Sequence, residues 1–270
     1  MIPSRAELRE HLVRTMIAGE VATPRQNNLL HYRRMAAGNP YYLFGLELKG
    51  SWTEAEILQV MVERCGVNPD PRHFYGDDTI DPDLTIDALD AMAERLAAVA
   101  AARGQVLLAT GHPSGLMPVH LAAGRALRAV GCKVLTPAEG WSYEVETGNG
   151  PQHRHIRYID GVAVLSGGGA LHHTHDAAPM EAMLASLAGE SGIWPDLVMA
   201  DHGWAGAAGQ AGIETVGFAD CNDPALFAGA AEGKIAVTVP LDDNVLPHHY
   251  APLTAYLLDR AGLPGAGPED

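Results

Sequence analysis

Cysteine and positive charge are both scarce in this chain of 270 residues. Its 3 cysteines, Cys65, Cys132 and Cys221, lie far apart without a C-x-x-C pair, which argues against a disulfide framework or a thiolate zinc site. The 18 Lys and Arg residues are outnumbered by 33 Asp and Glu residues, giving a formal charge of −15. Because nucleic-acid binders need a basic surface to displace phosphate counterions, we expect no nucleic-acid partner.

Long hydrophobic runs are also absent. No stretch approaches the roughly 18 uncharged apolar residues of a membrane span, and residues 1–14 carry charges where a signal peptide would be apolar. These features predict a cytoplasmic protein without a membrane partner, and they leave homo-oligomerisation open. What the chain does have is 47% hydrophobic residues, enough for a sizeable core, and 13 histidines, several of them clustered.

Residues 1–103 have the texture of a helical region. Ser4 stands at a capping position with Glu7 three residues later, a capping-box pattern. The segment 66–84 is rich in Pro, Asp and Gly and is predicted to be a loop. Apolar residues at helical spacing predict helices at 5–18, 54–65 and 85–103.

From residue 104 onwards, short apolar runs alternate with helix-length segments, a pattern typical of parallel sheets with crossover helices. The long segment 138–160 is predicted to be a loop, either a lid or disordered. We therefore predict an α/β fold, in which a helical cap region over 1–103 precedes a Rossmann-like three-layer domain with a mostly parallel sheet over 104–270. The expected strands are 105–110, 132–137, 161–166, 195–200, 214–219 and 234–239.

Ligands of open parallel sheets bind at the carboxyl ends of the strands, so the residues after each run are candidates. The first run is followed by Gly111, His112, Ser114 and Gly115 before a helix. Backbone N–H groups at such a turn bind phosphate, with Ser114 as a hydroxyl donor and His112 as a proton donor. An ordinary strand-to-helix turn explains the same residues.

Acidic residues follow the later strands. Asp201 and Asp220 each end an apolar run, and Asn222 and Asp223 come shortly after. Three converging carboxylates repel one another unless a cation compensates them, and oxygen ligands suit Mg²⁺ or Mn²⁺. Helix capping by the same residues is the simpler alternative.

Three histidines, His172, His173 and His175, lie close together after the third strand of the domain. If they bind metal, imidazole favours Zn²⁺, Ni²⁺ or Co²⁺. They equally suit binding to phosphate oxygens, as we expect for His172, or general acid catalysis, as we expect for His175. A solvated histidine-rich turn is the alternative.

The N-terminal region gathers donors around Arg25 and Asn28. Arginine binds phosphate bidentately, so a cap closing over the strand ends could place Arg25 and Asn28 against the substrate. The alternative is a solvated helix face.

Four segments together resemble a family of bacterial, largely actinobacterial, proteins designated phosphatases. They are IAGEVATPRQNNLLHYRRMAAG, LLATGHPSGLMPVHLAA, LVMADHGWAGAAGQAGIETVGFADCNDPALF and VTVPLDDNV. The third segment is the most specific of them, and 138–160 is the part without a match. The resemblance spans nearly the whole chain and implies a phosphate-processing enzyme without naming its substrate.

We therefore expect a metal-dependent phosphatase that hydrolyses a small phosphomonoester of the sugar-phosphate or nucleotide type. The metal ligands would be Asp201, Asp220, Asn222 and Asp223. His112, His175 and Asp201 would be catalytic. No D-x-D-x-[TV] motif begins the loop after any of the six expected strands, which disfavours an aspartyl-phosphate mechanism. A phosphosugar or nucleotide transferase or isomerase, or a non-catalytic phospholigand sensor, would use the same phosphate site.

Overall fold

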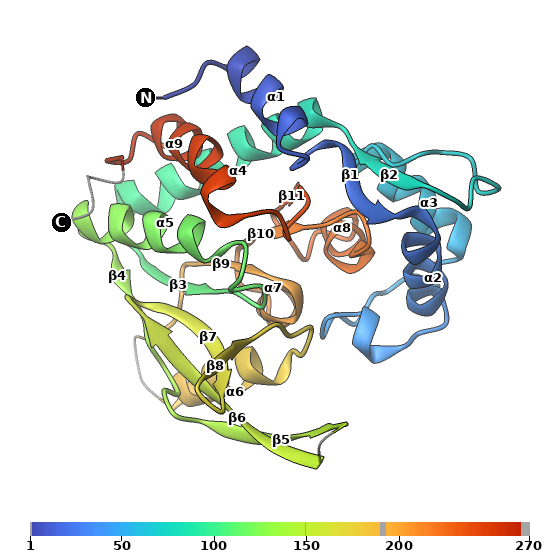
Figure 1. Cartoon of the computed structure of the whole chain (residues 1–270). Helices are drawn as coiled ribbons and strands as arrows, with labels where there is room; N and C mark the ends of the chain where they lie inside the picture. Colours follow the sequence, from blue (N-terminus) through green and yellow to red (C-terminus); the bar gives the residue numbers. More distant parts are fainter. Residues whose placement is uncertain (1, 149, 190–192, 266–270) are drawn as a thin grey trace.

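A central sheet dominates the computed structural model, which describes residues 2–148, 150–189 and 193–265 (Figure 1). Its strands follow the order β11-β10-β9-β3-β7-β6-β5, with β4 paired to β3 and β8 paired to β7. The strands of this sheet are β3 (Gln105–Ala109), β4 (Lys133–Val134), β5 (Ser142–Thr147), β6 (Gly150–Ile159), β7 (Val162–Gly167), β8 (Ala170–His172), β9 (Leu197–Asp201), β10 (Thr215–Ala219) and β11 (Val237–Pro240). All six predicted strands are therefore present, although the second contains only two residues.

Strands β11, β10, β9, β3 and β7 are parallel to one another, whereas β6 and β8 pair with β7 in the antiparallel direction. Every residue of β9 and β10 is buried, as expected for strands covered on both faces. Met199 pairs with Val216, and Val216 in turn pairs with Val237. This register brings the carboxyl ends of the three strands to one edge, where the acidic residues follow.

Two helix layers cover the sheet (Figure 1). Helices α7 and α8 connect β9, β10 and β11 and pack with α6, while α5 and α9 pack together with α4. The mixed α/β fold with a mostly parallel sheet is as predicted. The helices of these layers are α4 (Pro82–Ala102), α5 (Met117–Ala129), α6 (Ala178–Ala188), α7 (His202–Gln210), α8 (Pro224–Ala231) and α9 (Ala251–Arg260), with the short 3-10 helix η2 (Pro247–Tyr250) before α9.

The predicted helices of the N-terminal region are present as α1 (Arg5–Arg14), α3 (Glu54–Arg64) and α4, and Ser4 and Glu7 form the expected capping box. Not predicted were α2 (Arg25–Ala36), η1 (Pro40–Tyr42) and an antiparallel pair of β1 (Gly19–Pro24) with β2 (Asp77–Ile80). Strand β2 lies inside the predicted loop 66–84, so that prediction was wrong in part.

Helix α4 packs against β11 and α9, whereas α2 and α3 pack against α8. The N-terminal region thus packs against elements of both helix layers. The division of the chain into two regions after residue 103 stays a prediction. Among the residues that the structure describes, no helix is both long and apolar enough to cross a membrane.

The segment 138–160 is not the loop that its composition suggested. Its described residues contain the antiparallel hairpin of β5 and β6, with Ser142 opposite His155 and Thr147 opposite Gly150. Exposed and partly buried residues alternate strictly along β5. That period of two is a strand signal, but the glycines and polar residues of the segment obscured it. The hairpin extends the sheet beyond the helix layers (Figure 1).

Candidate active site

A cavity of about 430 Å³ opens at the carboxyl edge of the sheet. Its walls come from the loops after β3, β8, β10 and β11, from the start of α7, and from the end of β1 and the first turns of α2. The ionisable side chains that line it are His31, His112, His173, His175, His202, Asp220, Asp223, Asp242 and Asp243. The cavity therefore combines imidazoles and carboxylates, a donor set suited to metal binding and to proton transfer.

His202 is the most constrained of these side chains. It begins α7 directly after β9 with a φ of +48°, a left-handed conformation that is uncommon outside glycine. Its Nδ1 lies 2.8 Å from Asp201 Oδ1, and its Nε2 lies 3.3 Å from Asp223 Oδ2 and 3.4 Å from Asp243 Oδ2. Burial lowers the pKa of His202, but Asp223 and Asp201 together raise it well above its usual value. The strained backbone thus presents Nε2 to two carboxylates.

Asp201 lies behind His202 and does not line the cavity. It is fully buried, and its Oδ1 accepts hydrogen bonds from Gly111 N at 2.6 Å and from His202 Nδ1. Burial raises the pKa of Asp201, but the hydrogen bond and charge of His202 outweigh it and lower the pKa to about 2. Asp201 is therefore placed to orient His202, and its carboxylate lies outside the cavity lining, although the sequence predicted it as a metal ligand and catalytic residue.

Gly111 is required for this contact. A Cβ at this position would lie 2.5 Å from Thr174 O and 3.1 Å from Asp201 Oδ1. Its N–H is directed to Asp201 and is not free for the phosphate that the sequence predicted there. Behind Asp201, the Nε2 of the buried His120 lies 3.8 Å from the carboxylate.

The remaining histidines surround the His202 ring. His175 stacks on it with ring centroids 4.8 Å apart, and His173 approaches it edge-on at 4.9 Å. Burial and the charge of His202 lower the pKa of His173 to about 4 and that of His175 to about 2. Both imidazoles are therefore neutral at pH 7, which is the form that binds metal.

His112 lies beside His173, with ring centroids 4.5 Å apart, and its Nδ1 lies 2.9 Å from Asp243 Oδ1. Burial lowers the pKa of His112, but the neighbouring Asp243 carboxylate more than compensates and raises it above its usual value. His112 thus differs from His173 and His175 because it retains a proton more readily.

The carboxylates crowd one wall. Asp220 accepts hydrogen bonds from Thr23 Oγ1 at 2.8 Å and from Cys221 N at 2.6 Å. Burial, followed by the charges of Asp243 and Asp242, raises the pKa of Asp220 well above its usual value. Carboxyls with raised pKa values signal excess negative charge at one point. Asn222 also lines the cavity, and its carbonyl contacts His31 Nδ1 at 2.8 Å.

Among the described residues, three groups of side chains could each share a metal ion, because the ligand atoms within each group lie within 4.8 Å of one another. Asp243 Oδ2 is buried without a hydrogen-bond partner, and so is His175 Nδ1. Such atoms are costly unless a ligand satisfies them. The groups are His112 with His173 and His202, His175 with His202 and Asp223, and Asp220 with Asp242 and Asp243.

Arg25 and Asn28 do not line the cavity, contrary to the expected phosphate contact. Arg25 is fully buried, and its Nη1 lies 2.7 Å from Asp78 Oδ2. Asn28 Nδ2 donates to the same oxygen at 2.8 Å and to Cys221 Sγ at 3.2 Å. Arg25 is therefore part of a buried ion pair within the N-terminal region.

The turn after β3 also differs from the predicted phosphate site. The side chain of Ser114 is exposed and lies outside the cavity lining. Gly115 packs against the backbone of Asp243, since a Cβ there would lie 2.0 Å from Asp243 O. His172 Nε2 contacts Gly167 O at 2.8 Å, and its side chain lines a neighbouring cavity instead.

The site thus brings together His112, His175, Asp220, Asn222 and Asp223 from the predicted set. His173, one of the three clustered histidines, also lines it. The cavity adds residues to which the sequence analysis gave no role: His202, Asp242, Asp243, Thr23 and His31. His202, Asp242 and Asp243 also follow apolar runs, so the rule that selected Asp201 and Asp220 could have selected them as well. Thr23 and His31 carry no such signal, because α2 and β1 were not predicted.

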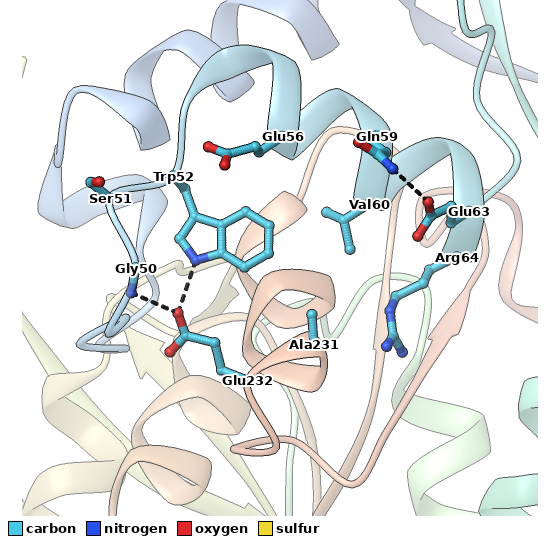
Figure 2. Close-up of a pocket in the computed structure, with 10 residues that line it drawn as sticks. All are labelled: Gly50, Ser51, Trp52, Glu56, Gln59, Val60, Glu63, Arg64, Ala231 and Glu232. Atoms are coloured by element: carbon cyan, nitrogen blue, oxygen red, sulfur yellow. Dashed lines mark hydrogen bonds between the residues drawn. The ribbon is translucent and has the colours of Figure 1, made fainter.

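A separate hollow of about 400 Å³ lies between α3 and the end of α8 (Figure 2). Trp52 Nε1 donates to Glu232 Oε1 at 2.9 Å, and the same carboxylate accepts the N–H groups of Lys49 and Gly50. Glu63 accepts a hydrogen bond from Gln59. The hydrogen bonds to Glu232 join the loop before α3 to the end of α8. The polar side chains of this hollow therefore have a structural role.

Fold and site together define an α/β protein with a histidine- and carboxylate-rich cavity at the carboxyl edge of a parallel sheet. Residues 3–265 match the model of the family described as Phosphatase. The chain is also similar to Phosphatase SCO2771 of Streptomyces coelicolor, with 54% identity over 263 residues and 97% of each chain covered. The chain belongs to this phosphatase family, which confirms the predicted resemblance and the expectation of a phosphatase.

Proposed function

We propose that this protein is a metal-dependent phosphatase that hydrolyses a small phosphomonoester in the strand-end cavity. The observation that carries the proposal is His202, which is held by Asp201 on Nδ1 and faces Asp223 and Asp243 with Nε2. Histidine ligands of metals characteristically donate their second N–H to a carboxylate in this way. The unpartnered Asp243 Oδ2 supplies a second point of attachment.

The donor set modifies the choice of metal. The sequence suggested oxygen ligands and hence Mg²⁺ or Mn²⁺, with Zn²⁺, Ni²⁺ or Co²⁺ if histidines took part. Because His175 and His202 share one group with Asp223, we propose a mixed nitrogen and oxygen site. Such a site favours Mn²⁺, Zn²⁺, Co²⁺ or Ni²⁺ over Mg²⁺. When bound, the metal would polarise the phosphoryl oxygens and lower the pKa of a water molecule.

The chain's own residues have distinct roles in this proposal. Asp223, Asp243, His175 and His202 would hold the metal, with Asp201 orienting His202. His202 would release its Nε2 proton on metal binding, because the metal would take the place of that proton between the carboxylates. His112 retains a proton through Asp243 and therefore donates it to the leaving oxygen as general acid. His173, which is neutral and exposed, donates a hydrogen bond to the phosphate.

Hydrolysis would proceed by direct attack of water, because Asp81 and Asp83, which have the D-x-D-x-T spacing of an aspartyl-phosphate motif, lie at the start of α4 and outside the cavity lining. The proposed substrate is a small phosphorylated metabolite rather than a nucleic acid, in keeping with the charge of −15. A cytoplasmic location and the absence of a membrane partner remain parts of the same proposal.

The test is phosphate release from a panel of phosphate esters by metal-stripped protein to which Mn²⁺, Zn²⁺, Co²⁺, Ni²⁺ or Mg²⁺ is returned. We expect release only after metal is added, and more with a transition metal than with Mg²⁺. Conversion of the ester without free phosphate would indicate a transferase or isomerase, and tight binding without turnover would indicate a sensor. Full activity in stripped protein would contradict the metal dependence.

A further inference from the structure

A second cavity of about 680 Å³ adjoins the proposed active site. His173 and His175 line both cavities, so the two spaces meet at these rings. The outer cavity is enclosed by η1, β8, the start of α6 and the β5–β6 hairpin. Its volume lies within the roughly 300–1,000 Å³ of small-molecule sites. A phosphate held in the inner cavity would therefore direct the rest of its ester into this space.

The hairpin gives this cavity an apolar and aromatic wall. Tyr143 and Val145 line it from β5, while the intervening Glu144 is exposed. Tyr41 lines the opposite side and stacks on His175, with ring centroids 4.8 Å apart. Leu165 of β7 adds a buried aliphatic side chain. These side chains suit a planar, largely apolar ring.

One cation enters the same wall. Arg154 of β6 is directly opposite Tyr143 in the hairpin and lines the cavity. Its Nη2 donates to Gln152 Oε1 at 2.9 Å and its Nη1 to His153 O at 3.4 Å, both of them uncharged acceptors. Within the described residues, no carboxylate forms an ion pair with Arg154, whereas most arginines of this acidic chain have one.

Two carboxylates also line the cavity, but both have local functions. Asp176 Oδ1 accepts the N–H of Ala178 at the start of α6. Glu181 lies in the first turn of α6, where the helix dipole favours a negative charge. The guanidinium of Arg154 is therefore the group left to pair with an anion, and guanidinium pairs best with carboxylate or phosphate.

Resting on the proposed function, we infer that the outer cavity binds the alcohol part of the substrate and selects a ring-bearing phosphomonoester that carries a second anionic group. Arg154 pairs with that anion, and Tyr143 packs on the ring. The second anion is a carboxylate or another phosphate, since both present the same chemistry to a guanidinium. The hairpin that falls outside the parallel core thus determines specificity.

The experiment compares kcat/KM for phenyl phosphate, para-carboxyphenyl phosphate, para-(phosphonomethyl)phenyl phosphate and glycerol phosphate, with the same added metal. We expect the parent protein to prefer the charged aryl esters to phenyl phosphate by about tenfold or more. The larger of the two preferences identifies carboxylate or phosphate as the natural group. Arg154→Gln should abolish the preference without changing turnover of glycerol phosphate, and Arg154→Lys should retain part of it.

Arg157→Gln is the matched control, because Arg157 lies on the same strand but is exposed and outside the cavity. Tyr143→Leu should weaken all aryl esters several-fold and spare glycerol phosphate. Equal kcat/KM for charged and uncharged aryl esters in the parent, or a preference that survives Arg154→Gln, would overturn the inference alone if glycerol phosphate is still hydrolysed. No phosphate release from any ester would instead overturn the proposed function, and this inference with it.

Discussion

Two buried charge clusters lie near the junction of β1 and α2, and they differ in how completely their polar atoms are satisfied. In the first, Asp78 accepts hydrogen bonds from Arg25 and Asn28 on Oδ2 and from the N–H groups of Asn68 and Thr79 on Oδ1. Arg25 also donates to two backbone carbonyls. Positive and negative charge balance there, and Asn28 Oδ1 is its unpartnered atom.

The second cluster, around His202, has more acceptors than donors. Asp223 and Asp243 both approach the single Nε2 of His202, while Asp220 and Asp242 add further negative charge. Buried charges persist only when paired or bound to metal. The comparison therefore separates a cluster whose charges are balanced within the fold from one with an excess of carboxylates, where we propose that a metal ion binds. This difference could not be read from residue types, since both clusters contain Asp and a basic partner.

The largest effect is expected from His202→Ala. Removing the imidazole eliminates Nε2 and leaves Asp201, Asp223 and Asp243 without their common partner. We expect activity to fall by more than the roughly 10–100-fold that loss of a ligand's supporting partner produces, with metal content reduced in parallel. Phosphate release and metal analysis of the purified protein measure both. His248→Ala is the control, because His248 is exposed and outside the cavity; activity of His202→Ala within threefold of the parent would place the site elsewhere.

A large effect of another kind is expected from Arg25→Ala. Because it strands the buried Asp78 carboxylate, the free energy of unfolding should fall by about 3–5 kcal/mol. The KM of the remaining folded protein should stay within twofold of the parent, since Arg25 does not reach the cavity.

Urea denaturation and kinetics at low temperature separate the two readouts for Arg25. The paired change Arg25→Met with Asp78→Asn should recover part of the lost stability, since it removes both charges and keeps an amide oxygen to accept from the N–H groups of Asn68 and Thr79. A KM raised tenfold at unchanged stability would restore the phosphate contact that the sequence suggested and would erase the distinction between the clusters.

His202 and Arg25 show how much of the site could be predicted from the sequence alone. Apolar runs located all the strands of the parallel core, and the rule that ligands bind at strand ends located the edge of the sheet where the cavity lies. The sequence could not show that His202, rather than Asp201, faces the cavity. Asp201 is the last residue of β9, and the left-handed backbone conformation of His202 turns the next side chain into the site. The pairing of Arg25 with Asp78 joins residues 53 positions apart through an unpredicted β1–β2 pair, so periodicity carried no trace of it.

A smaller effect is expected from Asp201→Asn. The substitution keeps the shape of the side chain but removes the charge that orients and charges His202. We expect metal affinity to fall about 10–100-fold, whereas a direct ligand would cause a greater loss of binding. Isothermal titration with Mn²⁺ or Zn²⁺ measures the change, with Asp223→Asn as the comparison. An Asp201→Asn loss equal to that of Asp223→Asn would return Asp201 to the ligands that the sequence proposed.

The smallest effect is expected from Ser114→Ala, which tests where the phosphate lies. The Ser114 side chain is exposed and outside the cavity lining, whereas His112, two residues earlier, lines the cavity against Asp243. Exposed substitutions usually change stability by less than about 0.5 kcal/mol, and we expect inhibition by inorganic phosphate to stay within twofold of the parent. His112→Ala should weaken that inhibition roughly tenfold or more, because a hydrogen bond from a charged donor is lost. The inhibition constants for inorganic phosphate, measured for both variants with the same metal, test this prediction. If Ser114→Ala weakens phosphate inhibition as much as His112→Ala does, the whole turn after β3 closes on the phosphate. The boundary drawn between cavity and surface would then be misplaced.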